Sequence, residues 1–163
     1  MNKTFFLIFL ILLSLNSVAS EHLISGSTYS GISKSDSVNS STNFVLQTSY
    51  QRDFFYKNIF MGIETFISLT SPKSSIRLGP IFTYHFDKKN ILNSFYTSAS
   101  VGLRKKENDS YNDYTYYSLR FGKSFKLNEK VAIRTYLYRT SFIYSNETTN
   151  TFGIHFLNIS VLL

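Results

Sequence analysis

The sequence predicts an all-β protein, a single eight-stranded antiparallel up-and-down transmembrane β-barrel that follows a cleaved signal peptide. Three observations support this fold. After residue 20 the apolar residues recur at every second position, which is the period of a β-strand, and no segment has a convincing helical period. Short turns alternate with longer polar connections along the chain. Glycine and charged residues share the strand face opposite the apolar residues, which suits a narrow barrel lumen.

Residues 1–20 have the pattern of a signal peptide. Lys3 gives a basic start, an apolar run extends from Phe5 to Leu13, and Val18-Ala19-Ser20 supplies the small residues of a cleavage site. The apolar run is too short for a hydrocarbon core about 30 Å thick, which needs about 20 residues. We therefore expect cleavage after Ser20 and a barrel domain over residues 21–163.

Export and the composition of the mature chain exclude several classes of protein. Removal of 20 of the 163 residues leaves 143, and because Lys3 is the only charged residue removed, the net charge falls from +7 to +6. A basic protein outside the cytoplasm is not expected to bind nucleic acid. The sequence has no cysteine, so it has no disulfide, no thiolate metal site and no lipidated cysteine.

The first three expected strands differ in the quality of their pattern. Residues 23–32 are rich in serine and alternate poorly, and a strand is expected there mainly because the sheet needs one to close. Residues 44–51 have apolar side chains or threonine at the even positions, and residues 58–70 have them at the odd positions. The apolar face from Ile59 to Leu69 spans roughly 28 Å at about 3.3 Å per residue and about 40° tilt, which matches the apolar band of a membrane barrel.

The next four expected strands alternate clearly. The more apolar face falls on the even positions of residues 76–86 and on the odd positions of residues 95–104, 117–125 and 131–138. Four glycines lie on the opposite, polar face of the central strands together with four charged residues: Gly62, Gly79, Gly102 and Gly122, with Glu64, Arg77, Arg104 and Arg120. A water-exposed polar face would not need glycine on four strands, whereas a narrow lumen would. We therefore place the apolar face toward lipid.

The last expected strand, residues 151–163, changes face along its length. Its apolar residues are Phe152, Ile154 and Phe156 on one face, then Leu157, Ile159, Val161 and Leu163 on the other. A β-bulge near Phe156 would return the second set to the same side of the sheet.

The connections predict how the barrel sits in a membrane. Three are short turns at residues 53–57, 87–90 and 127–130, whereas the others include polar segments at residues 33–42, 105–113 and 144–150 and a brief one at 71–75. Long loops at one rim, with short turns and both ends of the mature chain at the other, are typical of an up-and-down barrel in an outer membrane.

With these strands and connections, the chain resembles the small eight-stranded outer-membrane β-barrel proteins of Gram-negative bacteria. The resemblance lies in about 140 mature residues, eight alternating strands, the turns YHFDKKN and LNEK, and the C-terminal strand FLNISVLL. Leu163 stands where such proteins usually have an aromatic residue. The resemblance implies an outer-membrane location, outer-membrane lipid and lipopolysaccharide as surroundings, and the barrel-assembly machinery as a partner. We expect a monomer.

The charged residues of the lumen face predict an ionic network. Glu64, Arg120 and Arg134 lie at similar distances along strands that face each other across an eight-stranded barrel. Glu64 could therefore bridge Arg120 or Arg134, with Arg77 in a second layer, and plug the barrel. The alternative is a hydrated passage lined by the same charges. Because side chains fill the interior of an eight-stranded barrel, we favour the plug.

No residue pattern predicts catalysis, and we expect no enzyme. His85 and His155 are single histidines on strands, which are more often structural, and the sequence has no Gly-x-Ser-x-Gly turn. It also has no glycine-rich phosphate loop and no histidines at metal-ligand spacing, so we expect no cofactor and no metal.

Three functions fit the sequence. The first is a structural or surface-interaction barrel, whose loops carry basic residues toward anionic lipopolysaccharide: Lys34, Lys73, Lys105 and Lys106. The second is a small porin-like pore or transporter for minor solutes. The third is a soluble exported lipocalin-like barrel that binds an apolar ligand.

Overall fold

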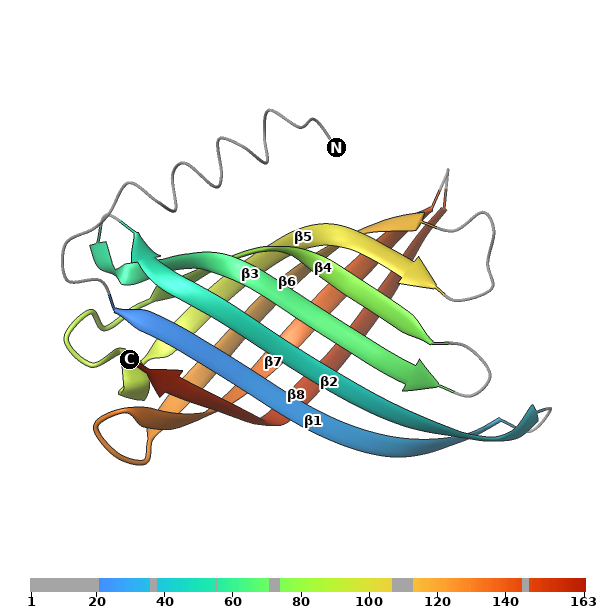
Figure 1. The fold of residues 1–163 in the computed structure, drawn as a ribbon, viewed down its shortest axis with the longest axis horizontal. Helices are drawn as coiled ribbons and strands as arrows, with labels where there is room; N and C mark the ends of the chain where they lie inside the picture. Colours follow the sequence, from blue (N-terminus) through green and yellow to red (C-terminus); the bar gives the residue numbers. More distant parts are fainter. Residues whose placement is uncertain (1–20, 36–37, 55, 71–73, 107–112, 145–146) are drawn as a thin grey trace.

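A computed structural model describes residues 21–35, 38–54, 56–70, 74–106, 113–144 and 147–163. In these residues the chain forms a closed barrel in which eight antiparallel strands pair in sequence order and the last strand pairs with the first (Figure 1). The predicted signal peptide lies outside the described residues. The strands are β1 (His22–Ser35), β2 (Val38–Phe54), β3 (Tyr56–Thr70), β4 (Ser75–His85), β5 (Phe95–Lys106), β6 (Asp113–Lys126), β7 (Val131–Tyr144) and β8 (Glu147–Leu162).

The predicted fold class is confirmed, with eight antiparallel strands in up-and-down order. We call the end of the barrel at residues 86–94 and 127–130 the turn end, and the opposite end the loop end. Both ends of the barrel domain lie at the turn end, where the backbone N–H of His22 donates to the carbonyl of Leu163 at 3.0 Å. No helix of the described residues is long and apolar enough to cross a membrane.

The loop-end connections are shorter than predicted. β1 and β2 remain paired as far as Ser35 and Val38, with a register shift after Ser33, so most of the expected loop at residues 33–42 is strand, and Lys34 lies in β1. Pairing also continues beyond the predicted limits where β7 meets β8, at Tyr144 and Glu147. These extensions are rich in serine, asparagine and threonine and lack the regular apolar alternation that predicts a strand, although their backbones pair. The β1–β2 hairpin reaches beyond its neighbours in Figure 1.

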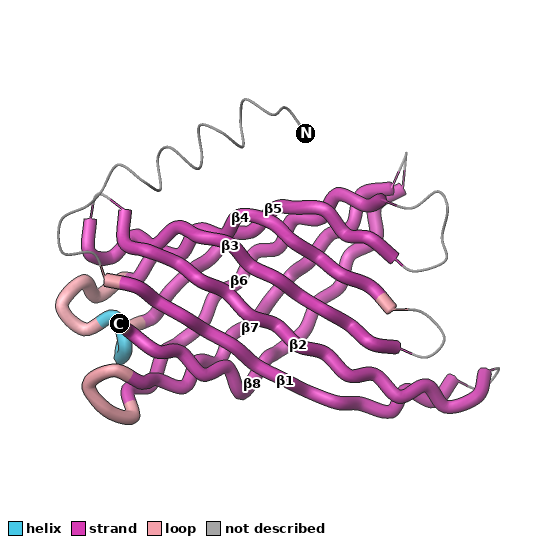
Figure 2. The backbone as a smooth tube through the Cα atoms, viewed as in Figure 1, coloured by secondary structure: helices cyan, strands magenta, loops and turns pink. Residues whose placement is uncertain are grey.

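The turn-end connection between β4 and β5 also differs from the prediction. A short turn at residues 87–90 was expected, but the chain goes on into a 3-10 helix, η1 (Ile91–Asn93), at the same end of the barrel as the C-terminus (Figure 2). Ile91 and Leu92 are buried. Ser94 fixes this connection, because its Oγ accepts from the backbone N–H of Asp87 at 2.9 Å and donates to the Phe95 carbonyl at 2.6 Å.

The two faces of the sheet are divided as predicted. Inward residues are mostly polar and buried, as shown by Gln47, Glu64 and Ser98. Each of the eight strands has exposed apolar residues on its outward face, including Ile24, Phe44, Leu69, Leu78, Phe82, Val101, Leu119, Phe121, Leu137, Ile154 and Ile159. A soluble monomer rarely exposes such a continuous apolar surface, whereas lipid would cover it.

The predicted bulge in β8 is confirmed. Arg134 of β7 pairs with Asn158, and Tyr136, two residues on, pairs with His155, three residues back along β8. β8 therefore contains one extra residue at this point. As a result Phe156 and Leu157 are both exposed, and the apolar residues on either side of the bulge face outward.

Close approach between strands explains glycines on the lumen face. A Cβ atom on Gly79 would lie 2.0 Å from the carbonyl oxygen of Val101 and 2.7 Å from the Cα of Gly102, and a Cβ on Gly102 would meet the Leu78 carbonyl oxygen at 2.2 Å. Lumen width was the reason expected from the sequence. At this pair the cause is instead the backbone of the neighbouring strand, which approaches closely where neither residue has a side chain.

Candidate functional site

The centre of the lumen contains an ion pair across the barrel. Glu64 on β3 is 2% exposed, and the Nη2 of Arg120 on β6 donates to its two carboxylate oxygens at 2.5 and 2.7 Å. The structure thus brings Glu64 together with Arg120, one of the two partners expected from the sequence. A charged hydrogen bond of this length in a site shielded from water is among the strong polar contacts of proteins.

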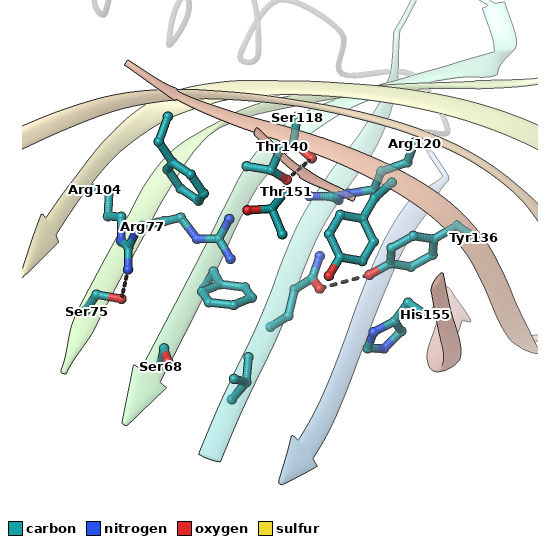
Figure 3. Close-up of a pocket in the computed structure, with 15 residues that line it drawn as sticks. Ser68, Ser75, Arg77, Arg104, Ser118, Arg120, Tyr136, Thr140, Thr151 and His155 are labelled. Carbon is teal, nitrogen blue, oxygen red and sulfur yellow. Dashed lines mark hydrogen bonds between the residues drawn. The ribbon is translucent and has the colours of Figure 1, made fainter. Parts of the chain in front are cut away.

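Two uncharged side chains complete this layer. Gln47 on β2 donates from Nε2 to Oε1 of Glu64 at 2.9 Å. The hydroxyl of Tyr136 on β7 donates to Oε1 of Gln47 at 2.9 Å, and this contact is the dashed line at Tyr136 in Figure 3. The ring of Tyr136 stacks on His155 with centroids 5.0 Å apart. We call Gln47, Glu64, Arg120 and Tyr136 the central layer. It connects four strands, and sequence analysis missed its two uncharged members.

Arg134 lies closer to the turn end and does not join Glu64. Its Nη2 is 2.8 Å from Nε2 of His85, its Nε donates to Oγ of Ser124 at 3.1 Å, and its guanidinium carbon lies 4.6 Å from the ring centroid of Tyr96. Because arginine is always protonated, His85 accepts at Nε2. We call Arg134, His85, Ser124 and Tyr96 the Arg134 layer. The expected alternative pairing of Arg134 with Glu64 is therefore wrong.

An apolar cluster lies between the Arg134 layer and the turn end. η1 contributes Ile91 and Leu92, which pack among Leu23, Phe60 and Ala132. All five side chains are at most 5% exposed. The Phe60 ring also meets the His85 ring edge-on, with centroids 5.7 Å apart, so the cluster contacts the Arg134 layer directly. We call these five residues the apolar seal.

On the loop-end side of the central layer the lumen contains a cavity of about 340 Å³, which we call the outer cavity (Figure 3). Arg77 on β4 and Arg104 on β5 line it, as does Arg120. The guanidinium of Arg77 lies 3.3 Å from the ring centroid of Phe66, and Nη2 of Arg104 donates to Oγ of Ser75 at 3.3 Å. Arg77 therefore lies near the ion pair, as expected, but belongs to the cavity wall.

A much smaller cavity, about 20 Å³, lies between the central layer and the Arg134 layer. Its lining includes side chains from both layers, among them Gln47, Arg120 and Arg134. That volume has room for about one water molecule. The polar layers therefore pack closely against each other, whereas the outer cavity has room for a small solute.

The basic residues expected in surface loops are dispersed. Lys105 is exposed near the end of β5, Lys106 is the last residue of that strand, and Lys34 is in β1. Strands β1 and β5 lie on opposite sides of the barrel, so the backbone positions of Lys34 and Lys105 are on separate strands that do not pair. Lys73 lies outside the described residues.

The two histidines weighed for catalysis have structural contacts. His85 accepts from Arg134, and His155 stacks on Tyr136. No group of three or more histidine, aspartate or glutamate side chains in the described part of the chain could hold a metal ion.

The closed barrel and its apolar exterior define a small eight-stranded membrane β-barrel. Among solved structures the chain is similar to Neisserial surface protein A, with 12% sequence identity and a TM-score of 0.59 over 87% of this chain and 95% of that one. A de novo designed transmembrane β-barrel also matches, with 9% identity and a TM-score of 0.46 over 91% of this chain and 98% of the design. The chain matches no model of a known protein family, and the comparison with curated proteins found no match.

Proposed function

We propose that the protein is an outer-membrane β-barrel with a structural or surface-interaction role and a plugged lumen. The observation that carries the proposal is that three layers of side chains follow one another along the lumen from the turn end. They are the apolar seal, the Arg134 layer and the central layer. A solute crossing the barrel would have to displace a buried apolar cluster and two hydrogen-bonded arginines. Each displacement is costly, because it would leave buried charged groups unpaired.

The exterior supports the membrane location. Its apolar exterior fits lipid, and the β1–β2 hairpin extends beyond its neighbours at the loop end (Figure 1), as do the outward-facing loops of barrels whose other end faces the periplasm. In this orientation the β1–β2 hairpin and Lys105 face outward from the cell. We infer that the hairpins and their basic residues contact anionic lipopolysaccharide or another surface, and that the barrel-assembly machinery inserts the chain as a monomer.

The other two functions are less consistent with the geometry. A pore needs a continuous passage, which the three layers interrupt. A lipocalin-like binder needs an apolar interior and a polar exterior, and here the inward residues are mostly polar while the exposed strand residues are mostly apolar.

Two measurements test the proposal. Fractionation of the cell envelope should place the mature protein in the outer membrane, resistant to carbonate extraction, and the folded protein in planar bilayers should give no ion conductance. Purification without detergent would contradict the membrane role. Steady conductance from the purified barrel would instead support the pore and contradict the plug.

A further inference from the structure

The outer cavity combines positive charge with the shape of a binding site, a property that the proposed structural role does not use. Its volume of about 340 Å³ is within the usual range of small-molecule pockets, which begins at about 300 Å³. Arg77 and Arg104 face each other as Cα partners on adjacent strands, and both side chains line the cavity. Figure 3 shows both side chains among the residues that line the cavity, with Arg104 directed toward Ser75.

Arg77 is held by aromatic rings in a way that leaves its hydrogen-bond donors for a ligand. Its guanidinium carbon lies 3.3 Å from the ring centroid of Phe66 and 5.5 Å from those of Tyr116 and Phe142. Ring faces attract the cation but accept no conventional hydrogen bond from the edge of the planar group. Among the described residues, Arg77 forms neither an ion pair nor a hydrogen bond.

Glu64, the carboxylate of the central layer, is already engaged. Arg120 donates to both of its oxygens, and Gln47 donates to one of them. Glu64 therefore compensates Arg120 directly, and the charge of Arg77 lies at the cavity wall beyond that contact. Hydroxyl groups on other strands complete the lining, with Ser118 and Thr140 hydrogen-bonded to each other at 2.9 Å and Thr151 nearby (Figure 3).

We propose that the outer cavity binds an oxyanion, a phosphoryl or carboxylate group on a solute small enough to enter it, with Arg77 as the principal ligand-binding residue. A planar guanidinium presents two parallel N–H donors that match the oxygens of either group. Serine and threonine hydroxyls would bind the remaining oxygens or the hydroxyls of a sugar. The inference goes beyond the proposed function and concerns only the loop-end half of the lumen.

The test is a calorimetric titration of the folded barrel in an uncharged detergent at low salt, with inorganic phosphate and glucose 6-phosphate as probes. Saturable binding that weakens as salt is added is expected, because added ions screen the attraction. Arg77→Gln should weaken binding about tenfold or more, as expected for loss of a charged hydrogen-bond donor. The matched control is Arg139→Gln, because Arg139 is exposed on β7 and donates to Asn150 outside the cavity lining. The Arg139→Gln variant should bind both probes with the same affinity as the wild type.

Absence of saturable binding to either probe would overturn the proposal, as would equal affinities for Arg77→Gln and the wild type. Folding of each variant is checked by the difference in gel mobility between unheated and boiled samples. If Arg77→Gln does not fold, Arg104→Gln has the same expected result and decides the question.

The phosphoryl group could belong to a dissolved solute or to a lipid headgroup, and a competition experiment separates the two sources. Phosphatidylglycerol added to the same detergent sample should displace glucose 6-phosphate if a headgroup enters the cavity. If glucose 6-phosphate still binds with unchanged affinity, the ligand is a dissolved solute. In both cases Arg77→Gln should weaken binding of the group that enters. Because these titrations use protein in detergent, their outcome is independent of the fractionation and conductance tests.

Discussion

Glu64 illustrates how a buried charge is accommodated in this lumen. Moving a carboxylate and a guanidinium out of water is costly, and the attraction between them offsets that cost only when further hydrogen bonds satisfy both groups. Here Gln47 donates to the carboxylate of Glu64, and Tyr136 in turn fixes the amide of Gln47. The ion pair therefore depends on neighbours from two other strands, and loss of one charge should affect the whole layer.

The first prediction follows from this dependence. Glu64→Gln keeps the size of the side chain but leaves Arg120 without its carboxylate. Removal of one partner of a buried ion pair costs about 3 to 5 kcal/mol, and water in the outer cavity should bring the value toward the low end. The urea midpoint of unfolding in detergent should therefore fall. Glu129→Gln, in an exposed turn, is the control and should change little, since exposed charges contribute about 0 to 1 kcal/mol. Equal shifts would contradict a stabilising central layer.

The sequence was enough to identify the charged residues of the lumen but not all of their contacts. The alternation of polar and apolar residues places Glu64 and Arg120 on the inner face, and counting along the strands from the short-turn rim predicts similar depths for these two residues and Arg134. Because barrel strands tilt and are staggered, similar counts on separate strands do not give equal heights. Arg134 consequently lies nearer the turn end beside His85. Gln47 and Tyr136 carry no charge, so their inward position was the only feature of the sequence that indicated a role in the lumen.

At the scale of the elements, the pairing of β4 with β5 depends on two glycines. The neighbouring backbone occupies the position that a Cβ of Gly79 would take, 2.0 Å from the Val101 carbonyl oxygen. Gly26 on β1 differs, because a Cβ there would lie 3.5 Å from the nearest atom, the Gln47 carbonyl oxygen, at ordinary contact distance. The two positions therefore allow a matched comparison of the same substitution.

The second prediction is that Gly79→Ala destabilises the barrel whereas Gly26→Ala does not. The added methyl group on Gly79 would force the two strands apart, and overpacking of this kind costs about 1 to 3 kcal/mol. In β1 the same change should be neutral or slightly stabilising, since glycine weakens a strand. Urea midpoints and refolding yields of the two variants measure the difference. If Gly79→Ala were tolerated as well as Gly26→Ala, the close approach of β4 and β5 would be wrong.

The 3-10 helix η1 is the other feature at this scale, and its Ile91 and Leu92 are buried in the apolar cluster near the turn end. Two adjacent apolar residues within a polar connection, Ile91 and Leu92, were the available signal for it. Strand periodicity could not detect that signal, because it depends on apolar residues at every second position, whereas Ile91 and Leu92 are adjacent. Both side chains are at most 5% exposed in the apolar seal.

The third prediction tests the apolar seal. Leu92→Ala should lower the free energy of unfolding by about 2 to 5 kcal/mol, the usual cost of emptying a buried leucine site. Leu127→Ala, in the exposed turn between β6 and β7 at the same end of the barrel, should cost far less because Leu127 is 60% exposed. Chemical unfolding in detergent compares the two. Similar losses would show that burial in the seal does not stabilise the barrel.

For the whole molecule, the distribution of side chains is the reverse of that in a water-soluble protein. Inward residues are mostly polar and hydrogen-bonded, while the exposed strand residues are mostly apolar. Sequence alternation was enough to predict this arrangement, since glycines and charges marked one face and large apolar side chains the other. The length of the polar hairpins was not predictable in this way, because backbone pairing outside the apolar belt has no such pattern.

The last prediction uses this reversal to distinguish lipid from water around the barrel. Leu119, near the middle of β6, and Leu127, in the β6–β7 turn, are similarly exposed, at 54% and 60%. In water an arginine at either position would have little effect, because neither side chain is buried. In lipid vesicles Leu119→Arg should lower the free energy of unfolding by about 2 to 4 kcal/mol, since a charge then faces the bilayer midplane, whereas Leu127→Arg should cost about 0 to 1 kcal/mol outside the apolar belt. Urea unfolding of barrels refolded into vesicles gives both values. Equal values would place Leu119 in water and contradict a lipid-facing exterior.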